Sequence, residues 1–116
     1  MAPNSRTEKA AALAAILSNP LRLAIVNRLR EGPSIVGDLV DAVDESQATV
    51  SKQLGILRDS GLLQCRPDGR CREYALANPA MVDAAIEALC SLATEAAAMG
   101  AKCRARRTMK STGQAV

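Results

Sequence analysis

One aromatic side chain, Tyr74, occurs in the whole 116-residue chain, although 48% of the residues are hydrophobic. Ala, Leu, Ile and Val must therefore fill the core, and Ala and Leu are strong helix formers. The composition thus predicts a mainly helical protein. A chain of this length suits one domain and can bury a core without staples, with dimerisation adding to the surface that is buried.

Apolar residues recur at helical spacing in five segments, at residues 7–17, 20–31, 34–43, 46–60 and 79–100. Asn19-Pro20 and Asn78-Pro79 are typical helix starts, since Asn caps a helix and Pro suits its first position. We expect Ser34 and Ser46 to open the third and fourth helices. Gly61 stands where a left-handed residue ends the fourth.

Two short strands, at residues 62–66 and 71–76, flank the turn sequence Pro67-Asp68-Gly69. A three-residue loop with a type I turn and a glycine bulge is the expectation for this sequence. It would place Cys65 opposite Cys71 and Arg66 opposite Arg70. The predicted fold is mainly α with a small β-hairpin, in the order α-α-α-α-β-β-α: a homodimeric winged helix-turn-helix.

The predicted organisation has three parts. Residues 1–6 form a disordered N-terminus, residues 7–104 form the winged helix-turn-helix domain with its dimerisation helices, and residues 105–116 form a basic disordered tail. No signal peptide is visible, and the early apolar stretch at residues 10–17 is too short to span a bilayer. We therefore expect a cytoplasmic protein with reduced thiols and no membrane partner.

The helix at residues 46–60 has the features of a DNA-reading helix. Its outward positions carry short hydroxyl and amide side chains and one base, which suit the base edges of the major groove. The hairpin that follows is basic and can lie along the backbone as a wing. An ordinary polar surface is the alternative. The predicted DNA-binding residues are Ser46, Gln47, Thr49, Ser51, Lys52, Gln53, Arg66, Arg70 and Arg72. The predicted partner is a pseudo-palindromic double-stranded operator.

An enzymatic function finds little support. The chain contains no histidine, which removes the commonest general base and a common zinc ligand. It also lacks a glycine-rich phosphate loop and a G-x-S-x-G nucleophile elbow. We therefore expect a binding protein and not an enzyme.

The chain resembles the ArsR/SmtB family of bacterial winged-helix repressors over about residues 10–95. The matching motifs are residues 18–26 (SNPLRLAIV), 36–39 (VGDL), 46–54 (SQATVSKQL), 57–63 (LRDSGLL), 68–70 (DGR) and 74–76 (YAL). The resemblance implies a homodimer joined through its first and last helices. It also implies repression of a nearby resistance or efflux operon, released when an inducer binds.

The sensing sites of that family do not carry over directly. Residues 34–37 hold Ser, Ile, Val and Gly where the family's third-helix metal site needs a cysteine pair. The positions of its last-helix zinc site hold Asn78, Ala80, Ser91 and Thr94. Neither set suits zinc, which prefers Cys, His and carboxylate ligands.

Four cysteines remain as candidate sensing residues: Cys65, Cys71, Cys90 and Cys103. A facing Cys65–Cys71 pair could form a disulfide or bind a soft ion such as arsenite, or the two could be plain strand residues. Cys90 fits a small buried apolar residue, whereas Cys103 lies beside two cations that favour a reactive thiolate. No cofactor is certain beyond a soft metal or metalloid ion on cysteine.

The sequence thus predicts a repressor that a thiol-reactive inducer releases from its operator. The inducer would be arsenite, another soft metal ion, or a redox or persulfide signal. The alternative is a winged-helix dimer that acts as a constitutive regulator or an interaction module without a small inducer.

Overall fold

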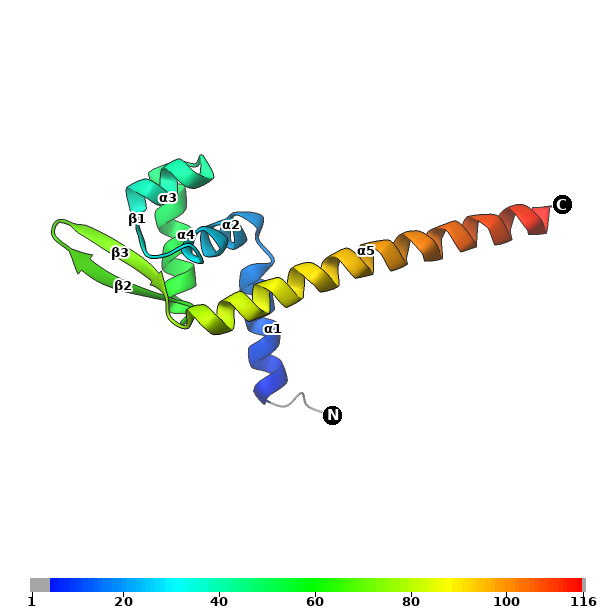
Figure 1. Ribbon diagram of the computed structural model, residues 1–116, viewed down its shortest axis with the longest axis horizontal. Helices are drawn as coiled ribbons and strands as arrows, with labels where there is room; N and C mark the ends of the chain where they lie inside the picture. Colours follow the sequence, from blue (N-terminus) through cyan, green and yellow to red (C-terminus); the bar gives the residue numbers. More distant parts are fainter. Residues whose placement is uncertain (1–4, 116) are drawn as a thin grey trace. The chain divides into compact units, whose positions relative to one another are not determined.

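The computed structural model describes the backbone of residues 5–115 and the side chains of residues 5–67, 69–70 and 72–108. The chain divides into two compact units, residues 1–79 and 80–116, where the sequence predicted one domain over residues 7–104. The elements of the first unit are α1 (Ser5–Leu17), α2 (Pro20–Leu29), β1 (Ser34–Ile35), α3 (Val36–Val43), α4 (Gln47–Asp59), β2 (Leu63–Asp68) and β3 (Cys71–Leu76). Helix α5 (Pro79–Ala115) forms the second (Figure 1).

Two helix starts in the first unit are held by the caps that the sequence predicts. The Asn19 side chain accepts hydrogen bonds from the backbone N–H groups of Leu21 and Arg22, at 2.9 and 3.0 Å. The Ser46 hydroxyl accepts one from the N–H of Thr49 at 3.1 Å. Each cap satisfies N–H groups that the first turn of a helix leaves without a partner.

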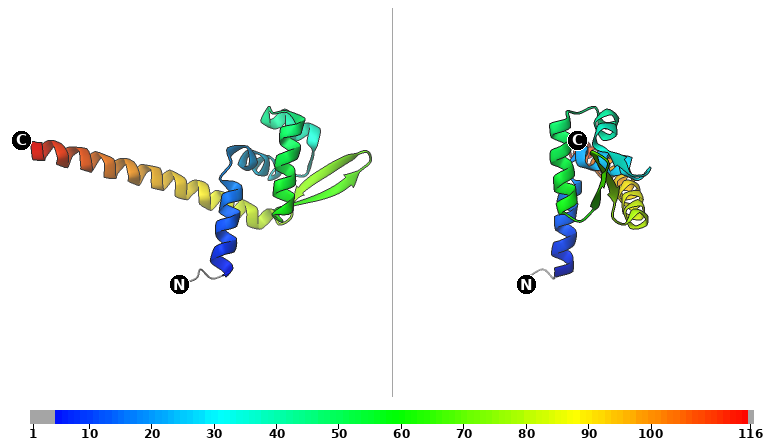
Figure 2. Two further views of the ribbon diagram at one scale, coloured as in Figure 1. Left: turned by 180° about the vertical axis from the view of Figure 1, so that it is seen from behind. Right: turned by 90° about the vertical axis from the view of Figure 1, so that its left-hand side faces the viewer.

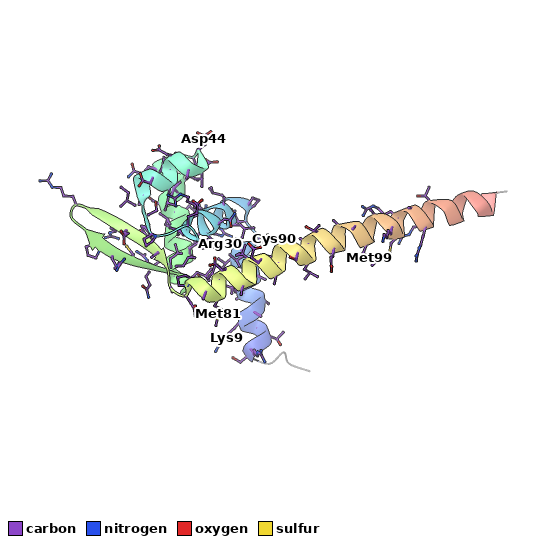
Figure 3. The ribbon with its side chains drawn as sticks, viewed as in Figure 1. Lys9, Arg30, Asp44, Met81, Cys90 and Met99 are labelled. Atoms are coloured by element: carbon purple, nitrogen blue, oxygen red, sulfur yellow. The ribbon has the colours of Figure 1, made fainter. Side chains whose placement is uncertain are left out.

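Asp44 forms the sharp turn between α3 and α4, and Figure 3 marks it at the end of α3. Its φ of 53° lies in the left-handed region, which Asp tolerates better than most residues. Helices α3 and α4 therefore form the two arms of a helix-turn-helix.

A third strand, β1, was not predicted. Ser34 and Ile35 pair with Tyr74 and Glu73 of β3, so the antiparallel sheet has the order β1-β3-β2. The prediction that Ser34 opens the third helix is wrong: Ile35 holds the N-cap position, without a side-chain cap bond. Pairing with β3 keeps Ser34 in extended backbone, and it fastens the hairpin to the start of α3.

The hairpin has a different register from the predicted one. Asp68 pairs with Cys71, Arg66 with Glu73 and Cys65 with Tyr74, so the loop is Gly69-Arg70. Gly69 has a φ of 60°, which suits the first position of a type II′ turn. Pro67 lies on the edge strand β2, where the missing N–H costs no ladder hydrogen bond. The predicted opposition of Cys65 to Cys71 and of Arg66 to Arg70 is therefore wrong.

The core of the first unit is aliphatic apart from Tyr74, as the composition predicts. Its buried residues are Ile25, Val26, Leu29, Leu39, Val50, Leu54, Leu57, Leu63, Tyr74 and Leu76. They come from α2, α3, α4 and both hairpin strands, so the core holds the helix-turn-helix and the hairpin in one body. The hairpin projects from the helices of this unit in both long views (Figures 1 and 2).

Helix α5 continues to Ala115, beyond the predicted end of the domain at residue 104. Ala, Arg, Lys and Met dominate residues 96–109, and all of them favour helix. The backbone of the segment predicted as a disordered tail is thus helical as far as it is described. At the other end, α1 begins at Ser5, so most of the predicted disordered N-terminus (residues 1–4) lies outside the described residues.

Candidate nucleic-acid interface

One side of α4 is exposed and largely polar. Gln47, Ser51, Gly55 and Arg58 follow each other at intervals of three and four residues, which places them on one side of the helix. Val50, Leu54 and Leu57 are fully buried on another side of α4, and their packing fixes the rotation of the helix about its axis. The exposed side therefore presents an amide, a hydroxyl, a glycine without a side chain, and a cation.

The other predicted residues of α4 have different surroundings. Ser46 and Thr49 are joined by the cap, in which the Ser46 hydroxyl also donates to the Thr49 hydroxyl at 2.8 Å. Lys52 is exposed. Gln53 is half-buried, and its side-chain oxygen accepts a 2.9 Å hydrogen bond from Arg22 of α2. Gln53 therefore lies toward α2, away from the side that carries Gln47 and Ser51.

The hairpin arginines also differ in their surroundings. Arg66 pairs with Glu73, its cross-strand neighbour, with 2.7 Å between Nη2 and Oε1. This ion pair offsets the positive charge of Arg66. Arg70 at the tip and Arg72 on β3 both line a cleft between the hairpin and α4. The structure thus brings these two arginines, and not Arg66, into that cleft together with Gln47 and Ser51.

This feature, the α4–hairpin cleft, has a volume of about 550 Å³. No carboxylate lines it among the described residues. It is lined by Ile35, Val36, Gly37, Gln47, Ser51, Gly55, Arg58, Arg70, Arg72 and Tyr74. A concave surface with three guanidinium groups and a few polar side chains suits a polyanion such as nucleic acid.

Tyr74 lies under the cleft and connects its parts. Burial raises the pKa of Tyr74 above its ordinary value of 10.0, and the neighbouring Cys65 raises it further. Arg58 and Arg72 act in the opposite direction, because positive charge and polar contact favour the phenolate. The phenol therefore stays protonated and uncharged at neutral pH.

Among the polar residues that line the cleft, the sequence prediction left out two, Arg58 and Tyr74. Arg58 stands eleven residues after Gln47, which is about three helical turns, so the α4 periodicity could have placed it on the same side. Tyr74 was treated only as part of a motif. Its place opposite Cys65 depends on the hairpin register, which the turn sequence alone did not give.

The candidate sensing cysteines are separated in the structure. Cys65 is half-buried and pairs with Tyr74, whereas Cys71 pairs with Asp68, three residues before Tyr74 in β3. Cys90 and Cys103 are exposed on α5, so the expectation of a buried Cys90 is wrong for the single chain (Figure 3). Among the described residues, no group of three His, Cys, Asp or Glu side chains could hold a metal ion.

Comparison with known proteins identifies this architecture. The family model described as "Bacterial regulatory protein, arsR family" matches residues 19–64, from α2 to the start of β2. The chain is 43% identical over 61 residues to the biofilm growth-associated repressor of Xylella fastidiosa, which covers 53% of this chain and 54% of that one. It is 45% identical over 62 residues to the arsenical resistance operon repressor of Escherichia coli, which covers 53% of each. The chain spans about half the length of these curated relatives.

Solved structures extend the likeness to at least three quarters of the chain. Reduced HlyU from Vibrio cholerae is 32% identical with a TM-score of 0.67, over 75% of this chain and 90% of HlyU. A homodimeric winged helix-turn-helix DNA-binding domain from Mycobacterium bovis, titled a possible ArsR-family regulator, is 26% identical with a TM-score of 0.66, over 78% and 91%. Both curated relatives described above are named as repressors and not as enzymes, as the resemblance predicts. The predicted winged helix-turn-helix is confirmed, and the chain belongs to the bacterial arsR family of regulatory proteins.

Proposed function

We propose that this protein is a homodimeric transcription repressor that binds a pseudo-palindromic DNA operator in the cytoplasm. The α4–hairpin cleft carries the proposal, because it combines base-reading side chains on α4 with arginines on the hairpin. In helix-turn-helix proteins the N-terminal residues of the second helix contact base edges, and here those include Gln47 and Ser51. Arg70 and Arg72 would then contact the backbone or the minor groove.

The proposed dimer uses α1 and α5. Leu89, Leu92 and Met99 of α5 are exposed, as is Leu13 of α1. A shallow hollow of about 480 Å³ beside α1 is lined by Leu13, Ile16 and three neighbours. Exposed apolar surface of this kind marks an interface in soluble proteins. A two-fold dimer would present two copies of α4 to half-sites about one helical turn of DNA apart.

The apolar character of α5 raises a second possibility, that the helix spans a membrane. Its segment Pro79–Thr108 is long and apolar enough, by length and composition, to cross a bilayer, with a mean hydropathy of 1.2 in its most apolar window. Helices α1 and α2 pass the same test only if the pair, bent by 94°, is counted as one span. Much of the apolarity of α5 comes from Ala, which equally suits close helix packing in a dimer. Recovery of the protein in the membrane fraction of lysed cells would contradict the proposal.

We further propose that a thiol-reactive inducer releases the repressor, through Cys90 and Cys103 of the two α5 helices. Both thiols are exposed, but thirteen residues separate them by about 20 Å within one helix, so a shared ion would need both protomers. The test titrates DNA-bound protein with arsenite, cadmium, persulfide and peroxide. Release that is lost in the Cys90→Ser, Cys103→Ser variant supports the proposal. If no reagent releases the DNA, the protein is a constitutive regulator.

Operator selection from a random duplex pool tests DNA reading directly. The proposal expects enrichment of a pseudo-palindrome, with half-site centres about 10 bp or a multiple apart. Enrichment of no sequence, although the protein is folded and dimeric, would contradict it.

A further inference from the structure

Arg58 and Arg72 each line two neighbouring hollows of the first unit. Both line the α4–hairpin cleft, and both line a second hollow of about 320 Å³ with Cys65 and Pro67. Arg58 comes from the last turns of α4 and Arg72 from β3. The two side chains therefore line the same two hollows from different elements, so that a single anion in either hollow could contact both.

The position of Arg58 along α4 fits the edge of a DNA groove. Eleven residues separate Gln47 from Arg58, which is about 16 Å along a helix axis. The major groove of B-DNA is about 12 Å wide. If Gln47 reads base edges, Arg58 on the same side of the helix reaches beyond the groove floor, to the backbone. Between them, Gly55 has no side chain, and a Cβ there would meet nothing within 4 Å, so the path is open.

Arg58 and Arg72 differ from Arg66 in how far a neighbouring carboxylate neutralises their positive charge. Arg66 is paired with Glu73 at 2.7 Å. Arg58 forms an ion pair with Asp59, with 3.6 Å between Nε and Oδ1, and the Asp59 side chain is 77% exposed. An ion pair that is this exposed to water is weak, so Asp59 neutralises little of the charge of Arg58. Among the described residues, no carboxylate lines either hollow beside Arg72, so its positive charge is available to a ligand.

We propose that Arg58 and Arg72 bind one phosphate of the DNA backbone between them, an inference that rests on the proposed function. A phosphodiester is a single negative charge with two free oxygens, which suits the planar donors of guanidinium groups. The site fixes how deeply α4 enters the groove, because it anchors the C-terminal end of the helix while Gln47 and Ser51 reach the bases. It carries no sequence information of its own.

The test measures affinity for random duplex DNA against salt concentration, so it needs no known operator. Each phosphate contact contributes about 0.9 to the slope of log affinity against log salt. Arg58→Gln and Arg72→Gln should each make the slope shallower, and the double variant should lose about one unit in total. Arg66→Gln is the matched control: it removes an arginine of the same hairpin that is already paired, and its slope should equal that of the wild type. Arg58→Lys should keep the wild-type slope, because it keeps the charge.

The outcomes separate this inference from the proposed function. Wild-type protein without salt-dependent DNA binding would contradict the function itself. Normal wild-type binding with unchanged slopes in both Arg→Gln variants would overturn the phosphate site alone. A loss of two units in the double variant would mean two separate phosphates and overturn the shared site. So would a slope that Arg58→Lys fails to preserve, because the effect would then be structural.

A free anion is the other source of the same chemistry. Inorganic phosphate is therefore titrated into the DNA-free protein at constant ionic strength. The proposal expects no saturable binding, because the DNA site relies on the rest of the duplex to present its phosphate. Saturable binding that is lost in Arg58→Gln, with DNA slopes unchanged, would assign the cleft to a small anion and overturn the assignment to DNA.

Discussion

Arg22 donates a 2.9 Å hydrogen bond from Nη1 to the side-chain oxygen of Gln53, which joins α2 to α4. Through Nε it also donates to the carbonyl oxygen of Ile16, in the last turn of α1, at 2.7 Å. One guanidinium thus joins α4, the proposed DNA-reading helix, to the end of α1, the proposed dimerisation helix. The orientation of α4 is set partly by this residue, and Gln53 is engaged in holding it.

Replacing Arg22 with Met should lower the free energy of unfolding by about 2 kcal/mol, since it removes two partly buried hydrogen bonds from a charged donor. Urea denaturation at fixed protein concentration measures the loss. Arg28→Met is the matched control on the same helix. Its partner Glu31 is exposed and only one helical turn away, so the expected change is within about 0.5 kcal/mol. Equal losses in the two variants would show that the link to α4 contributes nothing specific.

Gln47 and Gln53 offer a comparison of one residue type on two sides of α4. Gln47→Ala should weaken binding to the selected operator by about 1–3 kcal/mol and relax the choice at one base pair, because its side chain faces the groove. Gln53→Ala should leave that choice intact and lower stability instead, through the lost bond from Arg22. Competition binding against single-base operator variants distinguishes the two. Equal weakening of operator and random DNA by Gln47→Ala would rule out its base-reading role.

If the proposed dimer forms through α5, Leu89→Glu should convert it to monomers that lose binding to the selected operator. Leu89 is 45% exposed in the single chain, and a carboxylate buried in an apolar interface would be strongly destabilising. Ala98→Glu adds the same charge to an exposed position on the opposite side of α5 and should stay dimeric. Sedimentation measures both. A Leu89→Glu protein that sediments as a dimer would remove this side of α5 from the interface.

We predict that the free energy of unfolding falls in alkali because of the raised pKa of Tyr74. Its pKa is raised above 10.0 in the folded protein, so the unfolded chain releases the phenolic proton first. The stabilising contribution is complete below pH 10.0 and is lost as the pH rises through the higher folded value. Unfolding free energies of wild type and Tyr74→Phe from about pH 8 to about pH 11 test this. The wild type should lose more than the variant, and parallel curves would contradict the assignment.

The helices of this protein could be predicted from the sequence because their determinants are local. Each N-cap involves residues only a few positions apart: Asn19 precedes Pro20, and Ser46 accepts a hydrogen bond from the N–H of Thr49. The spacing of Val50, Leu54 and Leu57 likewise gives the buried side of α4. Once that side was known, the exposure of Gln47 and Ser51 followed.

The hairpin and the cleft could not be predicted in the same way because they depend on distant partners. Pro67-Asp68-Gly69 is compatible with more than one loop, and the register follows from the whole ladder, including the pairing of Ser34 with Tyr74. That register sets which arginine meets Glu73 and which lines the cleft. The sequence predicted that Gln53 contacts DNA, because nothing in the α4 sequence indicates its hydrogen bond with Arg22, 31 residues away.

Strand β2 lies at the edge of the sheet, with β3 on one side and no strand on the other among the described residues. An edge of this kind can recruit a strand from another copy and start aggregation. Pro67 removes one donor from that edge, and the exposed charge of Arg66 stands beside it. The proline that made the loop hard to predict thus makes this edge a poorer template for a strand from a second copy of the chain.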